Sequence, residues 1–174
     1  MPVFLITPHA YRSWNADNPR GYVRLNQGIL PPDPDQARRY DRRARHERVR
    51  FDQSVHELLI NGCRDVCARR GWRLHHVVVV SSHIHALVSW KGNSLRSEMV
   101  RDTMKRILGW MLAKHTEQAG RKWFSRKGSR KPVRDRQHLE HLMQTYLPDH
   151  AKGRRGGSGW CERKGYYGAA FNTP

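Results

Sequence analysis

Acidic side chains are scarce in this sequence. Asp and Glu number 15 against 33 Lys and Arg, so the 174-residue chain carries a formal net charge of +18. Such a surface releases condensed counterions when it meets phosphates, which favours DNA or RNA as the partner and an affinity that falls steeply as salt rises. The alternative is a basic surface that serves only solubility.

Cysteine is scarce too, and long apolar runs are lacking. The three cysteines, Cys63, Cys67 and Cys161, are an odd number without C-x-x-C spacing, which argues against a disulfide framework and a thiolate zinc site. No apolar run approaches the length of a membrane span, and the N-terminus shows no signal-peptide pattern. We therefore expect a cytoplasmic protein that does not enter a membrane.

The length favours one compact domain. Hydrophobic periodicity predicts a strand over residues 3–7, a helix over 51–70, two strands within 75–90, a helix that begins at Asn93 or Ser94, and a helix over 135–147. Residues 9–34 are rich in Pro, Gly, Asn and Asp and predict a long loop, whereas residues 36–50 are basic and compatible with a helix. A short edge strand is expected around Trp123 and Phe124.

Two apolar helix faces are expected to supply the core. In the helix over 51–70, Cys63 and Cys67 share the buried stripe, so they are interpreted as core residues rather than ligands. In the helix after residue 93, Met99 belongs to the apolar face and Arg101 lies off it.

The most informative stretch is His75–Trp90, HHVVVVSSHIHALVSW. A β-branched run reaches Ser81-Ser82, and the run beyond it alternates, which predicts two strands joined by a tight turn. Side chains alternate between the faces of a sheet, so His83 and His85 should project from the same face. Two such imidazoles can hold one divalent ion. In a chain with 11 histidines, the alternative is a pair of half-exposed strand histidines without a ligand.

A tyrosine and a third histidine follow on the helix over 135–147. The apolar positions of this helix place Tyr146 on the stripe that faces the sheet, and His150 comes one turn later. The alternative for Tyr146 is a core aromatic with its hydroxyl at the rim. Pro148 is expected to remove a helical hydrogen bond and to push Leu147 away from helical geometry.

The order of these parts resembles the single-tyrosine HUH transposases, in the branch related to the REP-associated tyrosine transposases. The motifs that carry the resemblance are NPRGYVR in the early loop, His83-Ile84-His85, and YLPDH with Tyr146. The resemblance implies an α+β fold, a ferredoxin-like or RRM-like antiparallel sheet with helices packed on one face. It covers residues 1–150 as one domain and leaves residues 151–174 as a Gly/Arg-rich C-terminal tail.

The resemblance also implies an activity. Members of this family cut and rejoin single-stranded DNA through a 5′-phosphotyrosine link and recognise DNA hairpins. By resemblance, Tyr146 is the catalytic nucleophile, and His83, His85 and His150 are ligands of Mg²⁺ or Mn²⁺. His150 stands where relatives usually have an amide, and imidazole suits Mn²⁺ at least as well. We leave open whether the chain acts as a monomer or as a homodimer whose Tyr146 helix completes the partner's site.

The residue types themselves suit phosphodiester cleavage and the binding of single-stranded DNA. Phosphodiester cleavage needs a nucleophile in line with the leaving oxygen and positive charge at the non-bridging oxygens, which a histidine-held divalent ion supplies. Single-stranded or hairpin DNA suits a chain in which aromatic rings alternate with cations. The residues predicted to contact nucleic acid are Arg20, Arg38, Arg39, Arg42, Arg43, Lys122, Trp123, Arg126, Lys127, Arg130, Lys131, Arg154 and Arg155.

Two other interpretations remain open. One is a non-catalytic nucleic-acid-binding protein, either a domesticated relative of such an enzyme or an RRM-like RNA binder. The other is a two-histidine phosphoesterase, which the absence of a second His-x-Ser/Thr motif disfavours.

Overall fold

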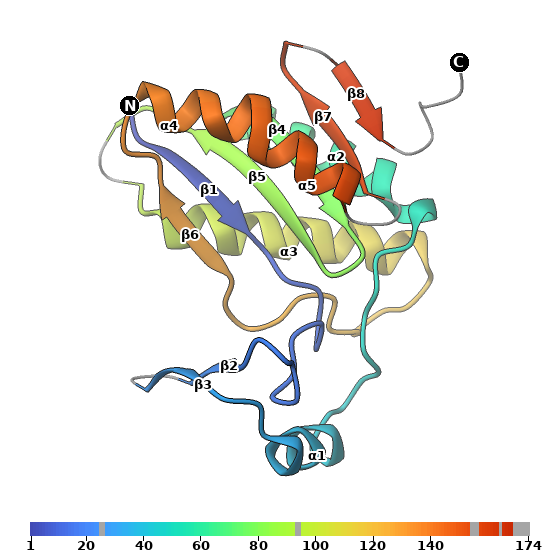
Figure 1. The fold of residues 1–174 in the computed structure, drawn as a ribbon. Coiled ribbons are helices and arrows are strands. Elements are labelled where there is room, and N and C mark those ends of the chain that lie inside the picture. Colours follow the sequence, from blue (N-terminus) through green and yellow to red (C-terminus); the bar gives the residue numbers. More distant parts are fainter. Residues whose placement is uncertain (25–26, 93–94, 154–156, 164, 169–174) are drawn as a thin grey trace.

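The computed structural model describes residues 1–24, 27–92, 95–153, 157–163 and 165–168. A six-stranded sheet, in the spatial order β6-β1-β5-β4-β7-β8, is antiparallel at every pairing (Figure 1). Its strands are β1 (Val3–Thr7), β4 (Arg73–Val80), β5 (His83–Ser89), β6 (Ser129–Pro132), β7 (Ser158–Cys161) and β8 (Gly165–Gly168).

The strands and helices follow the chain order of a ferredoxin-like unit. The order is β1, α2 (Gln53–Arg69), β4, β5, α3 (Ser97–His115) and β6. This β-α-β-β-α-β order, with β1 between β6 and β5 and with β4 beyond β5, confirms the predicted α+β class. Strands β7 and β8 extend the sheet beyond β4.

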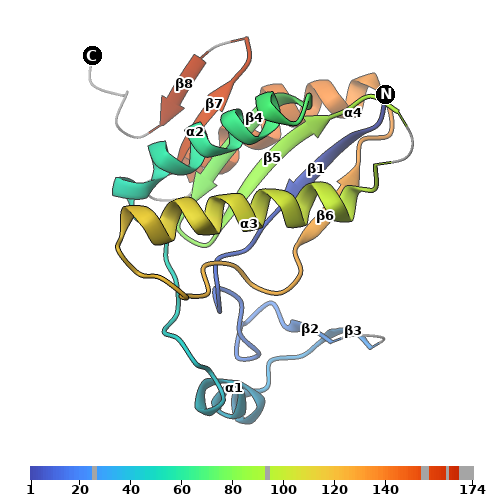
Figure 2. The ribbon, with the colours of Figure 1, turned by 180° about the vertical axis from the view of Figure 1, so that it is seen from behind.

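Helices cover both faces of the sheet, not one face as predicted. α2 and α3 pack on the face that carries Ile84 and Val88, whereas the C-terminal helix packs on the face that carries Leu87 (Figures 1 and 2). This C-terminal helix consists of α4 (Arg136–His141), a π-helical turn (Leu142–Tyr146) and α5 (Leu147–Gly153). The two faces differ because β5 alternates strictly, so each face has its own apolar side chains.

The predicted boundaries of α2 are close to those observed, whereas the helix predicted over 135–147 runs on to Gly153. α2 begins two residues after Phe51, because Asp52 caps it by accepting a hydrogen bond from the Ser54 amide at 3.0 Å. Cys63 and Cys67 are in the core, as predicted, and burial raises the pKa of Cys67 to about 12. The expected caps of α3, residues 93 and 94, lie outside the described residues.

The face of α3 differs from the prediction at two residues. Arg101 is buried, and its guanidinium pairs with Asp102 and reaches the Gly128 carbonyl at 3.4 Å. Met99, predicted to be buried, is 50% exposed. Periodicity assigns arginine to solvent by default, and it cannot anticipate a carbonyl from a distant loop.

Residues 12–24 and 27–48 form a small lobe below one end of the sheet (Figure 1). The predicted long loop contains a hairpin of β2 (Tyr22–Arg24) and β3 (Gly28–Leu30), and the basic segment forms α1 (Pro34–Arg42) and then leaves helical geometry. A minor core of Ala16, Tyr22 and Ala37 holds the lobe together.

Two further expectations are revised. Phe124 makes only an isolated bridge to Ala10, and the edge strand next to β1 is β6. The expected tail boundary at residue 150 falls inside α5, and β7 beyond it pairs with β4. Among the described residues, no helix is long and apolar enough to cross a membrane.

Candidate metal centre and nucleic-acid site

His83 and His85 project from the same face of β5, as strand alternation predicts. Both are buried, and their Nε2 atoms lie 3.1 Å apart. This is the face that the C-terminal helix covers, because Leu87 continues the alternation and packs against that helix. The pair therefore lies between the sheet and a helix rather than at a solvated edge.

His150 of α5 completes a cluster of three imidazoles. Its Nε2 atom lies 2.8 Å from that of His83, and one ring nitrogen from each of the three histidines falls within 4.8 Å of the others. Nitrogen ligands that bind an ion at right angles, with bonds of about 2.0–2.1 Å, are separated by about 3 Å. The spacing of the three rings therefore fits a divalent metal ion.

Two hydroxyls orient the imidazoles. Thr7 Oγ1 lies 2.9 Å from His85 Nδ1, and Ser82 Oγ lies 2.8 Å from His83 Nδ1. When each Nδ1–H donates to its hydroxyl, the Nε2 lone pairs face the centre of the cluster. Sequence reasoning missed Thr7 as a partner, because the contact joins two residues that are 78 positions apart in the chain.

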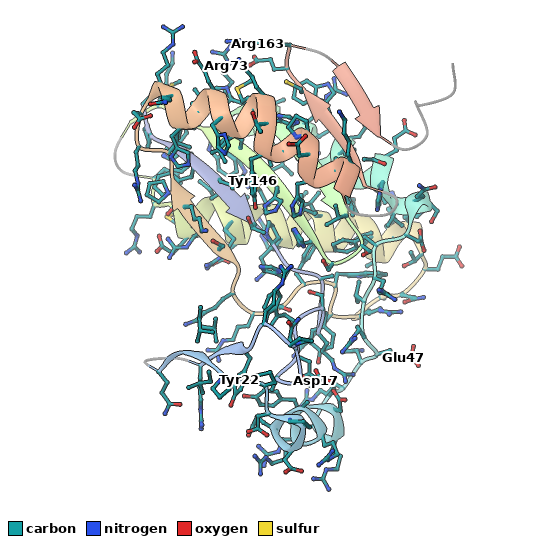
Figure 3. The ribbon with its side chains drawn as sticks, in the orientation of Figure 1. Asp17, Tyr22, Glu47, Arg73, Tyr146 and Arg163 are labelled. Atoms are coloured by element: carbon teal, nitrogen blue, oxygen red, sulfur yellow. The ribbon has the colours of Figure 1, made fainter. Side chains whose placement is uncertain are left out.

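Tyr146 lies beside the cluster. Its ring centroid is 5.7 Å from that of His85 and 5.7 Å from that of His150, with the His150 ring nearly parallel. The residue is 38% exposed, so it borders the buried stripe of its helix instead of lying within it. Figure 3 shows Tyr146 between the C-terminal helix and the strands. The phenol can therefore meet both the histidines and a ligand from solvent.

A π-helical turn sets the register of this helix. The Leu147 amide donates to the Leu142 carbonyl, five residues back, and Leu147 keeps right-handed helical angles in spite of Pro148. The predicted distortion of Leu147 is therefore wrong. A wider turn returns Leu142 and Leu147 to the same face, and both are buried against the sheet. After this turn the chain continues as the α-helix α5, so Tyr146 and His150 are separated by one α-helical turn.

A cavity of about 210 Å³ opens on the other side of Tyr146. Leu5 and Leu142 supply its apolar part, and Lys131 of β6 stands at its wall. His138 and His141 of α4 also line it, and sequence reasoning missed both. They occur at i and i+3 on the Tyr146 helix, a spacing that could have indicated a shared face.

His9 is a further histidine that the sequence did not single out. Its ring centroid lies 5.4 Å from that of His83, and burial lowers the pKa of His9. It follows β1 just after Pro8 and pairs with His83 in an isolated bridge. The end of β1 thus supplies two side chains, Thr7 and His9, around the histidine cluster.

The residues predicted to contact nucleic acid divide into three groups. Five of them are exposed arginines of the lobe, and Lys122, Arg126 and Lys127 are exposed in the loop before β6. In β6, Lys131 is exposed, whereas Arg130 pairs with Glu98 and donates to Ser97 Oγ at 2.9 Å. The five lobe arginines are Arg20, Arg38, Arg39, Arg42 and Arg43. Arg154 and Arg155 lie outside the described residues.

Trp123 does not have the exposed ring that base stacking requires. It is only 9% exposed, belongs to the α2–α3 core, and has the Arg121 guanidinium 5.0 Å above its ring. Its position in a basic stretch suggested a surface role, but the surrounding apolar residues bury it. Trp123 is therefore left out of the proposed interface.

Comparison with known proteins gives a match of fold. A solved structure of a REP-associated tyrosine transposase bound to a REP hairpin superposes with a TM-score of 0.50 at 11% identity. The alignment covers 87% of this chain and 67% of that chain. No family model matches the sequence, and no curated protein matches it. The similarity shows that the two chains share a fold.

Proposed function

We propose that this protein is a metal-dependent DNA strand transferase that nicks and rejoins single-stranded DNA through Tyr146, with recognition of a DNA hairpin. The observation that carries the proposal is the meeting of three imidazoles and a phenol from β5 and the C-terminal helix. The similar fold belongs to a transposase bound to a hairpin, which supports the same class of substrate.

The proposed reaction is a reversible transesterification. The Tyr146 phenol loses its proton, its oxygen bonds to the phosphorus, and the bond from phosphorus to the 3′ oxygen breaks. The released 3′ oxygen takes up a proton, and the 5′ phosphate stays on the tyrosine. A free 3′ hydroxyl reverses these steps and rejoins the strand, so no nucleotide cofactor is required.

The residues of the chain divide the work. His83, His85 and His150 would hold Mg²⁺ or Mn²⁺, which supplies positive charge at the non-bridging oxygens. Thr7 and Ser82 fix the ring orientations of His85 and His83. Lys131 stands where it can contact a phosphate next to the one attacked. The lobe arginines, at the same end of the sheet, would hold the rest of the DNA (Figure 1).

The deciding experiment is a search for a covalent adduct. We would incubate the protein with Mn²⁺ and labelled hairpins that carry single-stranded flanks, then run a denaturing gel. Wild type should give a shifted protein–DNA band that Tyr146→Phe lacks, while the DNA affinity of this variant is unchanged. Tyr40→Phe is the matched control, because Tyr40 is a tyrosine of similar exposure, 43%, in the lobe.

Two outcomes would contradict the proposal. A band that persists in Tyr146→Phe would mean that another residue is the nucleophile. No band with any strand, together with salt-sensitive hairpin binding, would favour the non-catalytic nucleic-acid-binding protein.

A further inference from the structure

Helices α2 and α3 lie side by side on the face of the sheet opposite the histidine cluster (Figure 2). A groove opens between them. The two helices pack tightly at Gly62, where a Cβ would stand 2.6 Å from Leu108 Cδ2. Towards the C-terminal end of α2 they enclose a cavity of about 610 Å³. Its lining consists of Val66, Arg69, Arg70, Arg106, Ile107 and Trp110.

Trp110 is the aromatic element of this groove. Its side chain is 64% exposed, although indole is among the side chains that gain most from burial. The Lys114 ammonium lies 5.6 Å from the centre of its ring. A large planar surface is thus open to solvent beside the apolar side chains of Val66 and Ile107.

The charges in the groove have one sign. Arg69, Arg70 and Arg106 line it, and no carboxylate does so among the described residues. None of these three arginines forms an ion pair with a carboxylate of any residue that the structure describes. The Arg69 Nε donates only to the Asp65 backbone carbonyl, at 3.4 Å. Three neighbouring guanidinium groups without a carboxylate partner favour an anionic ligand.

We infer that the α2–α3 groove is a second nucleic-acid site, which binds an unpaired nucleotide with its base stacked on Trp110 and its phosphates on the three arginines. An exposed aromatic ring among cations suits a single strand, since every base has a face that can stack. A duplex keeps its bases covered, and an acidic peptide would leave the indole ring without a planar partner. The net charge of +18 favours the same class of ligand.

The groove and the histidine cluster are separated by the sheet, so they contact different parts of a strand. A strand that reaches both would bind more tightly than either contact allows, because the second contact forms intramolecularly. The inference concerns binding only, and it stands or falls independently of cleavage at Tyr146.

The test is photo-crosslinking of the full chain to a single-stranded oligonucleotide that contains 5-iodouracil. It uses Tyr146→Phe in EDTA, so that no cleavage or covalent adduct can contribute. Trypsin releases residues 107–114, ILGWMLAK, which contain Trp110 and no other aromatic residue. We expect the crosslink in this peptide and its loss in Trp110→Ala.

Affinity measurements give a second readout. Trp110→Ala should weaken oligonucleotide binding by about 5- to 100-fold, as is usual when a stacked aromatic is removed. Met99→Ala is the matched control, because Met99 is an exposed apolar residue of α3 outside the groove. Arg106→Gln should reduce the dependence of affinity on salt, whereas Arg136→Gln removes the same charge on the other face and should not.

Crosslinks that avoid residues 107–114, with wild-type affinity in Trp110→Ala, would overturn the inference. The inference would also be wrong if poly-glutamate bound in a Trp110-dependent manner and the oligonucleotide did not bind in that manner. The groove would then be a protein-docking site. A crosslink in residues 107–114 of a protein that never forms an adduct would support this site and refute the proposed reaction.

Discussion

Thr7 is the hydroxyl partner of His85, one of the three histidines proposed as metal ligands. Its Oγ1 lies 2.9 Å from His85 Nδ1, and an Nδ1–H that donates to it would leave the Nε2 lone pair facing the other two imidazoles. Thr7→Val keeps the shape and removes only this partner. Loss of such a partner usually lowers metal affinity by about 10- to 100-fold, and we expect a decrease of this size for Mn²⁺ in titration calorimetry.

The control for Thr7→Val is Thr103→Val, in α3 on the opposite face of the sheet. It should bind Mn²⁺ as wild type does. Equal Mn²⁺ affinity in Thr7→Val and wild type would show that the hydroxyl does not orient the ligand.

Lys131 is the cation that lines the cavity beside Tyr146. In the proposed reaction, a contact from Lys131 to a phosphate that does not react would be made equally in the ground state and the transition state. We therefore expect Lys131→Ala to raise the KM for single-stranded DNA several-fold and to leave kcat nearly unchanged, as measured by adduct formation at varied DNA concentration. Lys91→Ala, an exposed lysine after β5, should change neither constant. A fall in kcat with constant KM would assign Lys131 to the transition state instead.

At the scale of elements, strand alternation was the most reliable guide. It placed His83 and His85 on one face, and helical periodicity placed Leu142 and Leu147 against the sheet. Neither pattern could reveal the π-helical turn, because helical periodicity assumes α-helical hydrogen bonds throughout, whereas the Leu147 amide donates to the Leu142 carbonyl five residues back. Nor could periodicity show that the C-terminal helix packs on one face of the sheet while α2 and α3 pack on the opposite face.

The junction of α5 and β7 depends on a glycine. A Cβ on Gly157 would stand 2.5 Å from the Ala151 backbone carbonyl, so the end of α5 would have to move. That end carries His150. We expect Gly157→Ala to lower the urea midpoint of unfolding and to weaken Mn²⁺ binding, because overpacking against backbone typically costs about 1–3 kcal/mol.

Gly109→Ala provides the comparison for that variant. A Cβ there makes only ordinary contacts, 3.9 Å from Phe124 and 4.0 Å from Trp123, and alanine favours a helix by about 1 kcal/mol. Its stability should be equal to or above that of wild type, with unchanged Mn²⁺ binding. If both variants bound Mn²⁺ equally, the position of His150 would not depend on this junction.

At the scale of the whole molecule, the composition predicted a nucleic-acid partner and the hydrophobic pattern predicted the fold class. Neither could predict where on the surface the positive charges would lie. Positive residues that are adjacent in the sequence separate in space: Lys131 lines the cavity at Tyr146, while Arg130 beside it pairs with Glu98 on the other face. The groove at Trp110 could not be predicted from the sequence, because its arginines come from two helices that only the folded chain brings together.

We expect two buried histidines outside the histidine cluster, His56 and His75, to make the stability of the molecule depend on pH. His56 of α2 lies 3.1 Å from Ser158 Oγ of β7, and His75 of β4 lies 2.9 Å from Ser89 Oγ of β5. Burial lowers the pKa of both; for His75, Arg73 and Arg163 act in the same direction, while Glu162 opposes them. Above the unfolded value of about 6.5, each is neutral in both states, and its contribution to stability is complete.

As the pH falls below about 6.5, the unfolded chain takes up protons that the folded chain does not, so the free energy of unfolding decreases. The decrease continues until the pH passes below the folded pKa values. Urea unfolding in EDTA at pH 7.5 and 5.5 should show a smaller loss of stability in His56→Gln and His75→Gln than in wild type. His115→Gln, an exposed histidine in the last turn of α3, should lose at least as much as wild type. An identical loss in all four proteins would mean that His56 and His75 are protonated to the same extent in the folded and unfolded states.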